Sequence, residues 1–231
     1  MTITSNTLFK AAGAAAAAAG LIFMGVQFNH PHLDATTIAT ANVVTRDCLK
    51  LLMSALALAG ITGMYLRQVT KMGLVGFIGY VLFAAGYLSM LGTSYVAALV
   101  LPTLAPTATA YVNDVIAMST SNPVTGDIGL LKFAMMFTAV GYLAGGCIFA
   151  IALFRANVLA RWAAALLAIG TLATVGVSIM PQYERLFALP TGFALVGLGY
   201  SLWRLQRTSA TTAASSAVAP VSRQLGTVGA H

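Results

Sequence analysis

The sequence predicts an all-α fold: a bundle of six transmembrane helices with the N-terminus and the C-terminus in the cytoplasm. Three observations support this prediction, namely scarce charge, long apolar runs and basic residues concentrated in alternate connections. Charged residues make up 7% and hydrophobic residues 59% of the 231 residues, and the mean hydropathy is +0.88. An ordinary soluble domain carries about 25% charged residues, so this chain has too few to cover a water-exposed surface. We therefore expect lipid to surround most of it.

Six apolar runs approach or exceed the length that crosses a membrane, which is about 20 residues for roughly 30 Å of hydrocarbon. The last run is the shortest and carries Pro190 near its start, where proline disturbs a helix least. Together the runs define a transmembrane domain over residues 1–207. The Ser-, Thr- and Ala-rich segment 208–231 is predicted to be a disordered cytoplasmic tail. The predicted spans are 8–28, 44–66, 74–101, 130–154, 162–180 and 188–203.

Lys and Arg concentrate in the cytoplasmic connections of membrane proteins, and this rule sets the predicted orientation. Basic residues follow the second, fourth and sixth runs, whereas 29–42 and 102–129 contain none and 181–187 contains one. These three connections, 29–42, 102–129 and 181–187, are therefore predicted to face outward. All five acids fall on that outer side: Asp34, Asp47, Asp114, Asp127 and Glu184.

The inner side is purely cationic, and we expect it to attract the anionic lipids of the cytoplasmic leaflet. Its basic residues are spread singly over helix ends: Arg67, Lys71, Arg155, Arg161, Arg204 and Arg207. Nucleic-acid-binding proteins instead gather basic residues on one presented face. The sequence therefore predicts the lipid bilayer, and not nucleic acid, as the partner of these cations.

His30, His32 and Asp34 form a candidate metal site after the first run. Pro31 favours an extended backbone at His30, and residues two apart in an extended segment point the same way. Two imidazoles and a carboxylate suit zinc or another divalent transition metal. The same residues also fit a pH sensor, because histidine titrates near neutrality, or a polar loop at the level of the lipid headgroups.

A second candidate site joins charges near the outer ends of two predicted helices. Asp47 and Lys50 lie three residues apart on one helix and can pair, and Arg46 and Lys50 share a face. Ionisable groups at membrane depth usually face the bundle interior or water. With Asp114, Asp127 and Lys132 they are predicted to line an outward-facing polar pocket; the alternative is that each pairs with a neighbour or a lipid headgroup.

The outer connection 102–129 is too long for a structureless loop in a compact protein. We expect a short helix near 111–118 that closes over this pocket. The small-residue pair Gly141 and Gly145 permits close helix approach. This pair predicts packing within the bundle, with a face for a second copy or for another membrane protein as the alternative.

The Asn29-His30-Pro31 loop after the first run and the Tyr65-Leu66-Arg67 end of the second give the chain a particular layout. This layout resembles small multi-pass bacterial integral membrane proteins of unknown function. The resemblance implies a plasma-membrane location and no defined activity.

Several motifs of common enzymes are missing from the sequence, including a Walker-type phosphate loop, a Gly-x-Ser-x-Gly elbow, His-Glu-x-x-His and Cys-x-x-Cys. Three function classes remain. The first is a small-molecule or lipid-handling component with an outer polar pocket. The second is a membrane-embedded metal-dependent enzyme with its site at the outer face. The third is a structural or regulatory partner of another membrane protein.

Overall fold

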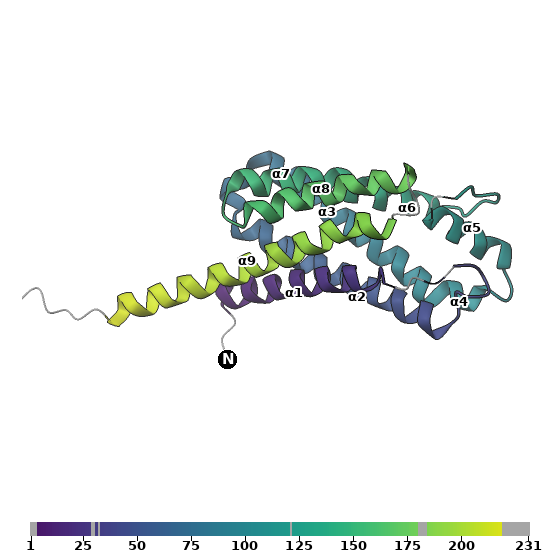
Figure 1. Cartoon of the computed structure of the whole chain (residues 1–231), viewed down its shortest axis with the longest axis horizontal. Coiled ribbons are helices and arrows are strands. Elements are labelled where there is room, and N and C mark those ends of the chain that lie inside the picture. The colour runs from purple at the N-terminus through teal and green to yellow at the C-terminus, as the bar shows by residue number, and fades with distance from the viewer. Residues whose placement is uncertain (1–3, 29–30, 32, 121, 180–183, 219–231) are drawn as a thin grey trace, which may run out of the picture.

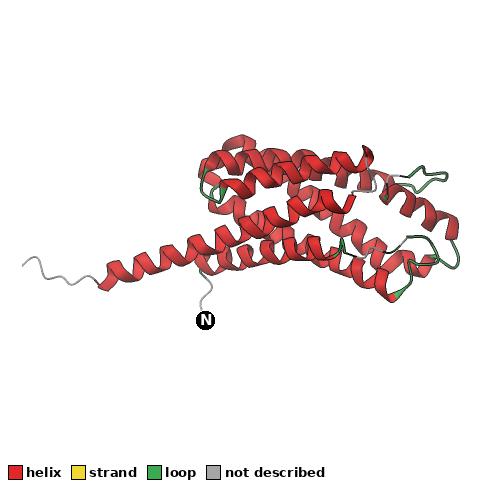
Figure 2. Cartoon of the chain, viewed as in Figure 1, coloured by secondary structure: helices red, strands yellow, loops and turns green. Residues whose placement is uncertain are grey.

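The computed structural model describes residues 4–28, 31, 33–120, 122–179 and 184–218. Every regular element in these ranges is helical (Figure 2), which confirms the all-α prediction for the described part of the chain. Two short π-helical segments are named η1 and η2. The elements are α1 (Ser5–Gly25), α2 (Ala41–Arg67), α3 (Val69–Tyr95), η1 (Val96–Val100), α4 (Leu101–Leu104), α5 (Thr109–Ser119), α6 (Leu131–Val140), η2 (Gly141–Gly145), α7 (Gly146–Ala156), α8 (Arg161–Ile179) and α9 (Glu184–Val218).

Five helical stretches are long and apolar enough to cross a membrane, and α3, η1 and α4 together form one of them. They match five of the six predicted runs, including the run that contains Pro190. The remaining run, 162–180, corresponds to α8 (Arg161–Ile179), within which Arg161–Gly176 is an apolar stretch. Several long apolar helices of this kind are compatible with a multi-pass membrane protein. The qualifying stretches are Ser5–Gly25, Ala41–Arg67, Val69–Leu104, Leu131–Ala156 and Leu186–Arg207.

The long helices lie side by side along the long axis of the molecule (Figure 1). Helix α1 packs between α9 and α2, and α3 packs against α2 on one side and against α6, η2 and α7 on the other. Helix α8 packs between α7 and α9. Helices α4 and α5 lie at one end of the bundle, and α9 projects past the other end (Figure 1).

Close backbone approach between α3 and η2 depends on glycine. A Cβ added to Gly86 would lie 2.7 Å from the backbone nitrogen of Tyr142, and one added to Gly141 would lie 2.9 Å from the Cα of Gly86. Neither position has room for a side chain, because the obstructing atoms are backbone. Gly145 likewise meets the backbone of Phe83. The pair Gly141 and Gly145 therefore packs within the bundle, as predicted.

The buried hydrophobic side chains form two separate cores. The main core fills the bundle around large buried side chains such as Phe83, Tyr87 and Phe149. A smaller core lies under α5 and holds Ile38, Val112 and Ile116 together with residues of α2, α4 and the loop before α6. We call the part of the molecule around this second core the outer cap, after the side of the membrane that the sequence predicts for it.

Helix α9 continues to Val218, whereas the sequence places the start of a disordered tail at residue 208. Small helix-compatible residues such as alanine follow Arg207, and the structure extends the helix through them. Residues 219–231 of the predicted tail lie outside the described ranges.

Candidate functional site

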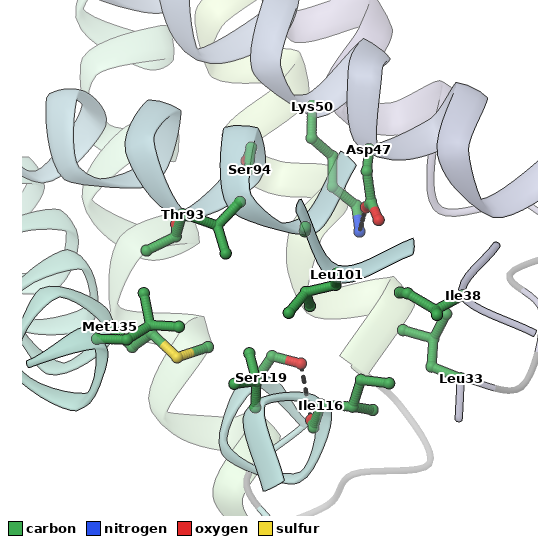
Figure 3. A pocket seen from close by; sticks show the side chains of 14 residues that line it. Leu33, Ile38, Asp47, Lys50, Thr93, Ser94, Leu101, Ile116, Ser119 and Met135 are labelled. Atoms are coloured by element: carbon green, nitrogen blue, oxygen red, sulfur yellow. Dashed lines mark hydrogen bonds and ion pairs between the residues drawn. The ribbon is translucent and has the colours of Figure 1, made fainter. Parts of the chain in front are cut away.

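A cavity of about 150 Å³ lies where the main bundle meets the outer cap (Figure 3). Its wall is mostly apolar, with a few polar side chains. We call it the outer cavity. It is lined by Leu33, Ile38, Asp47, Lys50, Thr93, Ser94, Val96, Ala97, Leu101, Val115, Ile116, Ser119, Leu131 and Met135.

One ion pair lies on the wall of the outer cavity. Lys50 Nζ donates to Asp47 Oδ1 at 2.9 Å, and the side chains are 31% and 7% exposed, respectively. Residues three apart in a helix lie on one face, so α2 presents both groups to the cavity. The partial burial of the pair strengthens its attraction, since the surroundings screen charge less than water does.

The Lys50 ammonium has three N–H donors, and the bond to Asp47 uses one of them. No other hydrogen bond from this ammonium occurs within the described residues. The pair as a whole is electrically neutral, yet it retains donor capacity next to apolar wall atoms such as those of Leu101 (Figure 3). This arrangement suits a molecule with a hydrogen-bond acceptor at one end and an apolar remainder.

A neighbouring part of the wall is formed where the helix that begins as α3 passes into η1, which packs against α2. Val96 and Ala97 of this π-helical segment line the cavity, and so do Thr93 and Ser94 directly before it. π-Helical segments inside α-helices occur frequently at functional sites. The Thr93 hydroxyl donates to Met90 O at 3.1 Å, which leaves its lone pairs as acceptors. The wall of the outer cavity therefore offers the Thr93 oxygen as an acceptor besides the ion pair.

Helix α5 covers the outer cavity, with Val115 and Ile116 in its wall. The predicted short helix near 111–118 is thus observed, slightly longer, as a lid element. Hydrogen bonds to two of its side chains hold it in place. Asn113 Oδ1 accepts from Ala35 N at 2.9 Å, and Asp114 Oδ1 accepts from Thr125 N at 2.9 Å. The bond from the Thr125 backbone lowers the pKa of Asp114.

Asp34 stabilises a turn in the segment before α2. Its Oδ1 accepts hydrogen bonds from Thr36 N at 2.8 Å and Thr37 N at 2.9 Å, and from the Thr36 hydroxyl. These bonds, with the one from the Thr36 side chain contributing most, lower the pKa of Asp34 to about 2. The carboxylate therefore has a local structural role.

The predicted metal ligands His30 and His32 lie outside the described residues. Within the described ranges, no three His, Cys, Asp or Glu side chains gather closely enough to hold a metal ion. The third predicted ligand, Asp34, directs Oδ1 to the turn amides. With two of its three ligands outside the described residues, the divalent-metal hypothesis stays a prediction.

Three further predicted residues do not line the outer cavity. Arg46 donates to Val26 O at 2.9 Å and Phe28 O at 2.8 Å, so it holds the end of α1 against α2. Asp127 Oδ1 accepts from Gly129 N at 2.8 Å in an exposed turn. Lys132 is exposed near the start of α6. Some charged side chains near helix ends therefore bind local backbone groups, whereas Asp47 and Lys50 line the cavity.

The structure therefore places Asp47 and Lys50 of the predicted cluster on one cavity wall and gives Asp34, Arg46, Asp114 and Asp127 other partners. Sequence reasoning missed the rest of the wall, including Thr93, Ser94 and the apolar side chains. Two adjacent hydroxyls in an otherwise apolar run were the available signal for Thr93 and Ser94. The apolar lining carries no such signal, because it resembles any other core residue.

Searches against protein families, curated proteins and solved structures gave no match to this chain. A function must therefore be argued from the geometry of the outer cavity.

Proposed function

We propose that this protein is a multi-pass component of the plasma membrane that binds a small amphipathic molecule in the outer cavity, in a small-molecule or lipid-handling role. The observation that carries the proposal is the Asp47–Lys50 ion pair on the wall of a mostly apolar cavity. Burial of charge is costly, and ionisable groups at membrane depth commonly mark sites of function. The pair thus provides a polar contact in a place that otherwise favours apolar groups.

The proposed topology has six spans, which are the five membrane-length stretches and α8. Helix α8 packs between α7 and α9, both of which are parts of membrane-length stretches. Arg67, Arg155 and Arg161 stand at helix ends joined by short connections. By the positive-inside rule that end of the bundle, and with it both termini, faces the cytoplasm. The outer cavity then opens near the opposite membrane face.

The ion pair and the apolar side chains of the wall each contact a different part of the ligand. An acceptor oxygen of the ligand receives a hydrogen bond from the Lys50 ammonium, while its hydrocarbon part contacts Leu101, Ile116 and Met135 (Figure 3). A cavity of roughly 150 Å³ is large enough for a benzene-sized group. The ligand is therefore a small molecule, or one end of a longer one.

The proposal is tested by thermal unfolding of the purified protein with three probes that share a six-carbon chain: 1-hexanol, hexanoate and hexylammonium. At ten times the Kd, a ligand stabilises the native state by about 1.4 kcal/mol. We expect 1-hexanol and hexanoate to raise Tm more than hexylammonium does, because hexylammonium offers Lys50 no acceptor and its charge is repelled by that of Lys50.

The variant Ala97→Leu fills part of the outer cavity and should abolish the stabilisation. Leu88→Ala is the matched control, since Leu88 is 60% exposed on the outside of α3, and it should respond as the wild type does. Equal responses of the wild type and Ala97→Leu would show that the probes act on the detergent, and the proposed site would then be wrong.

A further inference from the structure

A second cleft lies at the opposite end of the bundle, between the start of α3 and the end of α7. Its volume is about 220 Å³, and its polar groups are Lys71 and Arg155. We call it the basic cleft. It is built from different elements than the outer cavity, apart from the shared α3, and it plays no part in the proposed function.

Gly73 shapes the basic cleft. Its backbone has φ 58° and ψ −164° inside α3, a conformation that is accessible essentially to glycine alone. An added Cβ would meet nothing within 4 Å. Glycine is therefore required here because of the backbone dihedral angles, and not because a side chain would clash. The helix restarts after this kink, and the positive partial charge of its first turn adds to that of Lys71 nearby.

The two cations of the basic cleft contrast with others at the same end of the bundle. The guanidinium of Arg161 lies 4.0 Å from the ring centre of Phe154, and that of Arg207 lies 4.8 Å from the ring of Trp203. Lys71 and Arg155 are exposed and form no ion pair or ring contact within the described part of the chain. Both are therefore available to an anion.

An apolar surface begins at the cleft. Leu74 is 72% exposed and Val75 is 50% exposed, and Phe77, Ile78 and Val81 continue the exposed surface along α3. In a membrane this surface contacts hydrocarbon. A ligand that places an anionic group between Lys71 and Arg155 can thus lay hydrocarbon chains directly along the helix, which a free anion cannot do.

We propose that the basic cleft binds the phosphate-bearing headgroup of an anionic phospholipid, with Lys71 and Arg155 as its ligands and the acyl chains along α3. Arginine and lysine both recognise phosphate, arginine through two parallel N–H donors and lysine as a point charge. Neither Lys71–Val75 nor Ala152–Arg155 contains an acid, so no carboxylate from these segments competes for the cations.

The test uses the full chain in an uncharged detergent, titrated with dioleoylphosphatidylglycerol, dioleoylphosphatidylcholine or inorganic phosphate. Native mass spectrometry counts retained lipids, and thermal unfolding reports stabilisation. We expect phosphatidylglycerol to bind best. The double variant Lys71→Gln, Arg155→Gln should bind it roughly 30-fold more weakly, given the usual contribution of two basic residues near an anionic membrane surface.

The matched control is Arg161→Gln, Arg207→Gln, which removes the same net charge from the same end and should retain binding. The variant Lys71→Arg should also retain it, which separates lost charge from misfolding. Three results would overturn the inference: equal loss in both double variants, equal binding of phosphatidylcholine, or an inorganic phosphate effect as large as that of the lipid. The third would identify the ligand as a free anion. Each leaves the outer cavity untouched.

Discussion

The ammonium of Lys50 and the carboxylate of Asp47 form their ion pair at the boundary between two hydrophobic cores. Asp47 is nearly buried, and Lys50 is about a third exposed. Both face the outer cavity, where the main bundle and the outer cap meet. The pair is therefore a polar element built into an apolar boundary, and each member depends on the other to remain there.

Replacing Lys50 with methionine should destabilise the protein by about 2 kcal/mol, because the nearly buried Asp47 carboxylate loses the hydrogen-bond partner that it has among the described residues. Thermal unfolding in detergent should show a lower Tm. The change keeps the apolar stem of the side chain, so lost packing contributes little.

The double variant Asp47→Asn, Lys50→Met removes both charges and should recover most of the lost stability, since a buried pair replaced as a unit is often nearly neutral. If the double variant is less stable than Lys50→Met alone, the two groups do not compensate each other and the account of the pair is wrong.

Arg46 should control the order at the end of α1. Replacing Arg46 with glutamine removes the donors to Val26 O and Phe28 O, so the amides of residues 26–28 should exchange hydrogen faster. Asn42→Ala removes only the bond from Arg46 Nε to Asn42 Oδ1 and should have a smaller effect. Equal exchange in the Arg46→Gln variant and the wild type would contradict a structural role.

The turn around Asp34 should open in acid. Its pKa falls from 3.8 to about 2 on folding, so its contribution is complete above pH 3.8 and is lost as the pH falls toward 2. Hydrogen exchange at Thr36 and Thr37 should therefore accelerate between these values. Asp34→Ala should exchange fast at every pH. An unchanged acid response in that variant would assign the effect to another group.

Gly86→Ala should destabilise the protein by about 1–3 kcal/mol, the usual cost of an overpacked core, because its Cβ would meet the backbone of η2. Gly92→Ala, in the same helix, is the matched control, since a Cβ there meets nothing within 4 Å, and it should leave Tm nearly unchanged. Thermal unfolding of the two variants decides the matter, and similar losses would contradict close α3–η2 contact.

The long apolar helices were predictable because the length of a membrane span and the scarcity of charge constrain the sequence directly. Helix α5 was predictable from the length of its connection, and the pairing of Asp47 with Lys50 from their spacing. The positions of Arg46 and Asp114 were not, because each binds backbone groups that folding brings near: Val26 O for Arg46 and Thr125 N for Asp114. Nor does the sequence reveal that η1 turns Ala97 toward a cavity, since π-helical segments have no distinct apolar pattern.

Binding inside the outer cavity is tested most directly by the methyl NMR signal of Met135, which lines the cavity. The protein is labelled with ¹³C-methyl methionine, titrated with 1-hexanol, and assigned with Met135→Leu. We predict a saturable shift of the Met135 signal, no shift at the buried Met64 in the main core, and no saturable Met135 shift in the Ala97→Leu variant. A Met135 signal that does not move, or that moves equally in the Ala97→Leu variant, would contradict the proposed site.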